Sequence, residues 1–149
     1  MAEYNLILTV HVLAVIVAVG SNVTYGFWLH LAGSDRDRIL FAIRGIRWLD
    51  RRVALPGYLV TFVTGVAMVL TGMWRFDQGW ILISIVLYLF TAFAGFTLFA
   101  PAIRRQVAEA ERDPRSDAYE AAAARTGQLG FLTVAIVGLI VVLMVTKPF

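Results

Sequence analysis

Four apolar stretches constrain this chain more than any other feature of its sequence. They cover about residues 4–31, 53–73, 80–103 and 127–146. A helix needs roughly 20 apolar residues to cross the hydrocarbon core of a bilayer, so each stretch is long enough. None shows the alternating pattern of a membrane β-strand. The sequence therefore predicts an all-α fold, a transmembrane antiparallel four-helix bundle that forms one domain over residues 1–149.

Composition agrees with a lipid environment. Hydrophobic residues make up 60% of the chain and charged residues 15%, which is more apolar surface than a soluble domain of this size could bury. The chain has no cysteine, which excludes disulfides, thiolate metal sites and cysteine nucleophiles. The first stretch starts with MAEY, without a basic residue, and is too long for a signal-peptide core, so we expect a retained span.

Basic residues are concentrated in two of the three connectors. Residues 32–52 contain six arginines and residues 104–125 contain five, which leaves only Arg75 and Lys147 elsewhere. Basic loops of membrane proteins stay in the cytoplasm. We therefore expect a multi-pass membrane protein with both termini outside and the arginine-rich loops in the cytoplasm. Topology explains the positive charge, so no nucleic-acid partner is expected.

The first connector has the pattern of an amphipathic helix over about residues 34–52. Ser34 followed by Asp37 is typical of a helix start, and apolar residues then recur at helical spacing. We expect this helix to lie on the inner membrane surface and to contact lipid head groups. The arginines that share its polar face are Arg44, Arg47 and Arg51.

Turn signals delimit the connectors. Asp50 and the Pro56-Gly57 pair predict a turn from the surface helix into the second span. Asp113-Pro114 predicts a break in the third connector, after which Ser116 can cap the next helix.

Small and weakly polar residues recur at steps of three and four in every span. Membrane helices associate through such residues, because burying apolar side chains gains little among equally apolar lipid tails. We expect these residues, together with Asn22, to face the bundle interior. In chain order they are His11, Ala14, Ala18, Ser21 and Tyr25; Gly57, Thr61, Thr64, Met68 and Thr71; Ser84, Tyr88, Thr91 and Gly95; and Ala135, Gly138 and Val142.

His11 is the main candidate for a functional residue. It lies about two turns inside the membrane, whereas His30 lies near the inner end of the same span. The two are 19 residues apart, about 28 Å along a helix, so they cannot share a metal ion. An intramembrane imidazole can ligate haem iron or another metal, relay protons, contact a quinone, or hydrogen-bond a neighbouring helix.

A haem held by His11 would be five-coordinate or need a second ligand. Met68 on the second span is the candidate within the chain, although a core methionine more often only packs. A ligand from a second protomer is the other alternative. Asn22 can hydrogen-bond across helices or contact a solute.

Other chemistries lack their residues. The apolar centres of the spans contain no Asp, Glu, Lys or Arg, which argues against a carboxylate proton relay and a voltage sensor. The chain has no P-loop and no HExxH motif, and its four methionines are too scattered for a copper site.

Three segments resemble a known family over nearly the whole chain. TVHVLAVIVAVGSN, WLDRRVALPGYLVTFVTGVAMV and LMVTKPF are similar to an uncharacterised family of small bacterial membrane proteins with four spans. The arrangement is more distantly similar to CopD-type copper-resistance domains and HemJ-type protoporphyrinogen oxidases, in which a first-span histidine stands where His11 does. The latter resemblance implies haem b as a candidate cofactor. The residues that carry the family pattern are Asp50, Arg51, Pro56, Gly57, Thr64, Gly65, Met144, Lys147 and Pro148.

Three functions stay open at this point. The bundle could bind haem or a similar redox ligand at His11. It could instead be a non-catalytic accessory or structural subunit that contacts a second copy or another membrane protein, with His11 joining two helices. The third alternative is a small-solute transporter.

A label in the loop between Trp74 and Gly79 tests the orientation. We expect a membrane-impermeant reagent to reach it from outside intact cells, because this connector is poor in basic residues. A label in the 104–125 connector is the control and should react only after permeabilisation. Detection of the 74–79 loop in the cytoplasm would overturn the predicted orientation.

Overall fold

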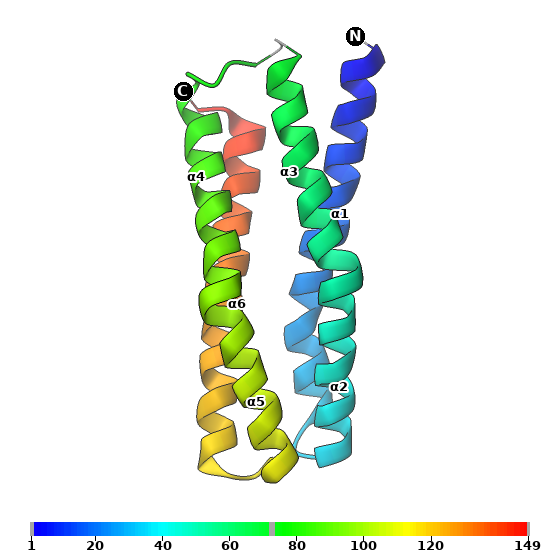
Figure 1. Ribbon diagram of the computed structural model, residues 1–149, viewed down its shortest axis with the longest axis vertical. Helices are drawn as coiled ribbons and strands as arrows, with labels where there is room; N and C mark the ends of the chain where they lie inside the picture. The colour runs from blue at the N-terminus through cyan, green and yellow to red at the C-terminus, as the bar shows by residue number, and fades with distance from the viewer. Residues whose placement is uncertain (1, 72–73, 149) are drawn as a thin grey trace.

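The computed structural model describes residues 2–71 and 74–148, and this part of the chain is helical apart from short connections. The expected all-α four-helix bundle is confirmed, with both termini at one end (Figure 1). We call this the terminal end and the opposite end the arginine-rich end. The helices are α1 (Ala2–Ala32), α2 (Arg36–Leu49), the π-helix η1 (Asp50–Ala54), α3 (Leu55–Leu70), α4 (Gly79–Ala94), the π-helix η2 (Gly95–Phe99), α5 (Ala100–Arg112) and α6 (Asp117–Thr146).

Two of the four long helices are composite. α2, η1 and α3 form one helix over Arg36–Leu70, and α4, η2 and α5 form another over Gly79–Arg112. The four long helices have 30 to 35 residues and are apolar enough to cross a membrane. At 1.5 Å per residue they are about 45–52 Å long, whereas the hydrocarbon core is about 30 Å thick. Part of the bundle therefore projects beyond the hydrocarbon. The last two residues of the second predicted span, Gly72 and Met73, lie outside the described residues.

Prolines explain the two π-helical segments. The Leu55 N–H donates to the Asp50 carbonyl and the Ala100 N–H to the Gly95 carbonyl, and each donor directly precedes a proline, Pro56 or Pro101. Proline in a helix lacks the N–H and crowds the carbonyl four residues earlier, and a wider π turn relieves that conflict. The chain therefore does not turn at Pro56-Gly57, as the sequence suggested, but continues as a helix.

The amphipathic helix is present as α2, and it runs in line with α3 (Figure 1). Its start is capped by Asp35 rather than Ser34, because the Asp35 carboxylate accepts a 2.9 Å hydrogen bond from the Arg38 N–H. Ser116 caps α6 as predicted, accepting from the Tyr119 N–H at 3.2 Å. The apolar face of α2 packs against α1 and α5 and forms the main hydrophobic core. This core comprises Ala32, Ile39, Ala42, Ile43 and Ala110.

α1 and the α2–η1–α3 helix pack as an antiparallel pair with a seven-residue repeat. The His11 ring contacts Thr64, Gly57 approaches Ala18, and Ala32 shares the core with Ile43. Each step of seven along α1 thus matches a step of seven back along its partner, as in an antiparallel coiled coil. The same register places the buried Tyr25 opposite Asp50. We call this contact the α1–α3 seam.

The second pair consists of α6 against α4 and α5. Ser84 is buried there, as the sequence predicted. On α6, by contrast, the predicted inward residues Ala135, Gly138 and Val142 are exposed, and the buried residues are Ala122, Thr126 and Val137. The stripe of Ala135, Gly138 and Val142 therefore does not mark the contact face of α6.

Aromatic side chains join the two pairs away from the main core. The Phe62 and Tyr88 rings stack with centroids 5.4 Å apart. At the terminal end, the Trp74 indole N–H donates to the Tyr4 hydroxyl at 2.8 Å, and the Lys147 ammonium lies 4.1 Å from the Trp74 ring centroid. Trp74 also packs edge-to-face against the buried Trp80. These contacts link the start of the chain, the 74–79 loop and the end of the chain.

Substituting Gly57 by alanine tests the seam. A Cβ there would lie 3.0 Å from the Ala18 Cβ and 3.4 Å from the Ala14 carbonyl oxygen. We expect Gly57→Ala to lower the free energy of unfolding in detergent by about 1–3 kcal/mol, because two rigid helices must separate.

Gly20→Ala on α1 is the matched control, since no heavy atom lies within 4 Å of its added Cβ. It should be neutral or slightly stabilising. Ala18→Gly combined with Gly57→Ala should restore much of the stability. Equal effects of the two single glycine substitutions would refute the proposed close contact.

Candidate functional site

His11 lies in the α1–α3 seam with its side chain only 8% exposed. Its Nδ1 is 3.0 Å from the Thr64 hydroxyl oxygen on α3. Gly65 gives the ring its space, because a Cβ at that position would be 3.3 Å from the His11 Cε1. One edge of the imidazole is therefore fitted against α3.

The hydrogen bonds of Thr64 fix which ring nitrogen carries the proton. The Thr64 hydroxyl oxygen is 2.6 Å from the Val60 carbonyl oxygen, so its single hydrogen is donated there. The hydroxyl can then only accept from His11, and the ring must donate through Nδ1–H. This leaves the lone pair on Nε2.

Met68 is buried on α3, one turn beyond Thr64, and is 8% exposed. It lies on the same pair of contacting helices as His11. Two axial ligands must hold a haem between them, but α1 and α3 are in direct contact along the seam, as the 3.0 Å approach at Gly57 shows. The geometry therefore does not fit a haem placed between His11 and Met68.

A second polar group connects three helices nearer the arginine-rich end. The Asn22 amide N–H donates to the Tyr58 hydroxyl at 2.6 Å, and the Tyr88 hydroxyl of α4 donates to the Tyr58 carbonyl at 2.7 Å. Tyr25 is buried beside this group, but its hydroxyl has no hydrogen-bond partner among the described residues. The Asn22 Oδ1 is also buried without one.

The remaining polar residues expected inside the bundle bond within their own helices. Ser21 donates to the Val17 carbonyl at 2.7 Å, and Thr91 donates to the Leu87 carbonyl at 2.8 Å. Thr61 likewise donates to the Gly57 carbonyl at 2.9 Å. These three hydroxyls donate their hydrogen bonds within their own helices and do not join neighbouring helices.

Tyr58 was not among the residues expected to face the bundle interior, and the role of Asp50 was not predicted either. Asp50 was interpreted as a turn marker, yet it lies half-buried in η1, in the middle of a continuous helix. The signal that could have found it is the heptad step, since Asp50 lies 14 residues before Thr64 and Tyr25 lies 14 residues after His11.

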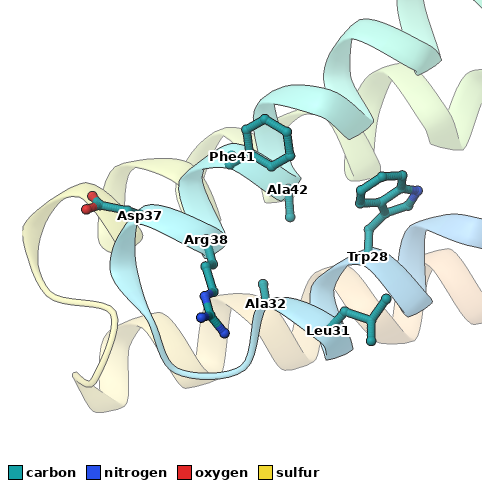
Figure 2. A pocket seen from close by; sticks show the side chains of 7 residues that line it. All are labelled: Trp28, Leu31, Ala32, Asp37, Arg38, Phe41 and Ala42. Atoms are coloured by element: carbon teal, nitrogen blue, oxygen red, sulfur yellow. The ribbon is translucent and has the colours of Figure 1, made fainter.

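A groove of about 410 Å³ lies far from His11, at the arginine-rich end (Figure 2). Figure 2 shows it between the end of α1 and the start of α2, with Arg38 near the connecting turn and Trp28 at the other side. Trp28 is 17 residues from His11, about 26 Å along α1. The groove is therefore not part of the His11 site. The residues that line it are Trp28, Leu31, Ala32, Asp37, Arg38, Phe41 and Ala42.

A family match covers nearly the whole chain. Residues 5–148 match the family described as "Predicted integral membrane protein (DUF2269)". The chain belongs to this family. No curated protein and no solved structure matches it. The resemblance to an uncharacterised membrane protein family is thereby confirmed.

The donor set of this DUF2269 chain limits which metal groups it can hold. Among the described residues, no cluster of three or more His, Cys, Asp or Glu side chains is close enough to bind a metal ion. A metal at His11 would therefore need most of its ligands from a cofactor, as haem iron does from its porphyrin. Met68 does not fit as a second ligand beside His11, because α1 and α3 touch along the seam.

Thr64→Val removes the acceptor for the His11 N–H. We expect the free energy of unfolding in detergent to fall by about 1 kcal/mol, as for other hydrogen bonds between membrane helices. Thr97→Val is the control, because Thr97 is exposed and donates only to the Phe93 carbonyl of its own helix.

A double-mutant cycle with His11→Ala measures the coupling between the two side chains. The cycle should give a coupling energy close to the loss seen in Thr64→Val. Strictly additive single effects would show that the hydrogen bond between His11 and Thr64 contributes nothing.

Proposed function

We propose that this DUF2269 chain is a membrane-embedded bundle that binds haem or a similar redox ligand through the Nε2 atom of His11. The observation that carries this proposal is the chain of hydrogen bonds from His11 Nδ1 through Thr64 to the Val60 carbonyl. It orients the ring and leaves the lone pair on Nε2.

Metal-binding histidines have the same kind of support. Their second ring N–H almost always donates to a carboxylate, a carbonyl or water, which fixes the tautomer and strengthens the other nitrogen as a ligand. Thr64 provides that partner here. An ionisable side chain within a membrane span is costly and is a functional candidate by default. The first-span position of His11 also agrees with the distant similarity to HemJ-type proteins.

In the proposed site, His11 would be the ligand that this chain supplies. Met68 would not be a second ligand, because α1 and α3 touch along the seam and leave no room for a porphyrin between His11 and Met68; a donor from a second protomer would be the alternative. Haem b, when bound, would supply one-electron chemistry. The chain's own residues would position the imidazole and keep its Nε2 unprotonated.

A non-catalytic role is the second candidate. The observation that favours it is the close fit of the His11 ring against Gly65, which makes the imidazole a good contact between helices. In this alternative the bundle is an accessory or structural subunit, and its partner is a second copy or another membrane protein. His11 then contributes stability only.

The proposed setting is the bacterial cytoplasmic membrane, with both termini outside. Leu70 and Arg51 are 19 residues apart on one composite helix, or about 28 Å, which is close to the hydrocarbon thickness. Arg44 and Arg51 are exposed and Arg47 is half-buried, beyond that apolar length. We assign these three arginines to the head groups of the inner leaflet.

An absorption spectrum of the detergent-purified protein tests the proposal. After haem supplementation we expect a Soret band in the wild type and in His30→Ala, whose histidine is exposed near the arginine-rich end. His11→Ala should lose the band. Thr64→Val should keep haem but shift its spectrum or reduce its affinity about tenfold or more, because the supporting hydrogen bond is gone.

A stable, colourless wild-type protein after haem supplementation would refute haem binding. Destabilisation by His11→Ala in that same preparation would then favour the structural role. A Soret band that survives in His11→Ala would show that a residue other than His11 binds the haem.

A further inference from the structure

Asp50 is a carboxylate without a cationic partner inside a membrane helix. It is half-buried in η1, and no described residue forms an ion pair with it. Arg51 and Arg52 follow it directly, but both are exposed and neither forms an ion pair with it. Arg47, one turn earlier, is half-buried and also unpaired with it. A partly buried charge is costly unless something compensates it.

Two buried oxygen atoms on α1 also lack partners. The Tyr25 side chain is 9% exposed, and its hydroxyl has no hydrogen bond among the described residues. The Asn22 Oδ1 is also buried and also has no hydrogen bond among the described residues. The Asn22 N–H is already used by the Tyr58 hydroxyl at 2.6 Å, so its oxygen is the free end of the amide. Buried polar atoms in native proteins are almost always satisfied, so these two indicate a missing partner.

The seam brings these groups together. Its seven-residue register places Tyr25 of α1 opposite Asp50, and η1 contacts both α1 and α3. Asn22 lies one turn before Tyr25 on the same face of α1. The Asp50 carboxylate, which forms no ion pair, and the two buried oxygens without partners, from Tyr25 and Asn22, therefore face one region of the seam near the arginine-rich edge of the hydrocarbon.

We propose that Asp50, Asn22 and Tyr25 form a binding site for a small monovalent cation such as Na⁺. Oxygen atoms from a carboxylate, an amide and a hydroxyl are the ligands that hard cations prefer. One carboxylate matches one positive charge, whereas a divalent ion would require more acidic ligands. The cation neutralises Asp50 and occupies the two oxygens that the protein leaves unpaired.

The π-helix explains how the carboxylate reaches this position. The Asp50 carbonyl bonds the Leu55 N–H, one residue further along than in an α-helix. Such an insertion changes the direction of the side chains around it, and π turns in α-helices are often found at functional sites. The site lies 14 residues from His11 along α1, about 21 Å away. It is therefore independent of the haem proposal.

Binding of radioactive ²²Na⁺ to the purified wild-type protein tests the proposal. We expect saturable binding of one ion per chain that unlabelled Na⁺ displaces and choline does not. Asp50→Asn should abolish it, whereas Asp37→Asn, which removes an exposed carboxylate from α2, should leave it unchanged. Tyr25→Phe should weaken the affinity about tenfold, because it removes one oxygen ligand.

Thermal unfolding provides a measurement that does not depend on variants. The midpoint of the wild type should rise with NaCl relative to choline chloride at equal ionic strength, because a ligand that binds only the folded state stabilises it. Equal midpoints in the two salts, together with no saturable ²²Na⁺ binding, would overturn the proposal. Binding that persists in Asp50→Asn would also overturn it. His11→Ala should retain cation binding, so the two proposals fail separately.

Discussion

The close approach of α1 to α3 at Gly57 and Ala18 is the contact on which the packing of the membrane-spanning part of the bundle depends. Lipid provides no hydrophobic drive for helices to associate, so they must gain packing and polar contacts by coming close. The missing Cβ at Gly57 permits this approach. Once that pair is set, the seven-residue register determines the others: His11 meets Thr64 on one side, and Tyr25 lies opposite Asp50 on the other. Both proposed sites are consequences of one backbone contact.

Different forces hold the two ends of the bundle. At the arginine-rich end, α2 and α5 extend past the apolar length of the spans, and the buried residues there include Ile39 and Ile43, as in the core of a soluble protein. Water surrounds that end, so apolar burial stabilises it. Within the membrane-spanning part of the bundle, the two helix pairs are joined by aromatic stacking and hydrogen bonds, such as those of Tyr88. The bundle changes its packing chemistry along its length because its solvent changes.

Hydropathy and helical spacing were sufficient to predict the four helices and most of the seam. His11, Ala18 and Tyr25 are buried, as their spacing indicated, because a seven-residue step is visible in one sequence. The composite helices could not be predicted from the sequence, because a proline such as Pro56 normally indicates a helix boundary. Only the π turn before it allows Pro56 to lie inside a continuous helix. That error concealed Asp50. The contact face of α6 was also missed, because Ala135 and Gly138 are small but face outward, and small size alone does not tell lipid from a neighbouring helix.

The contact of Lys147 with the Trp74 ring has a consequence for how the molecule is made. Lys147 is among the last residues of the chain, and Trp74 in turn holds Tyr4 near its beginning. During synthesis the N-terminal part of a chain is available to fold first. The α1–α3 pair can thus assemble while α6 is still being translated. The contacts of Trp74 with Tyr4 and Lys147 at the terminal end, by contrast, require the end of α6. Closure of this end therefore follows the synthesis of α6.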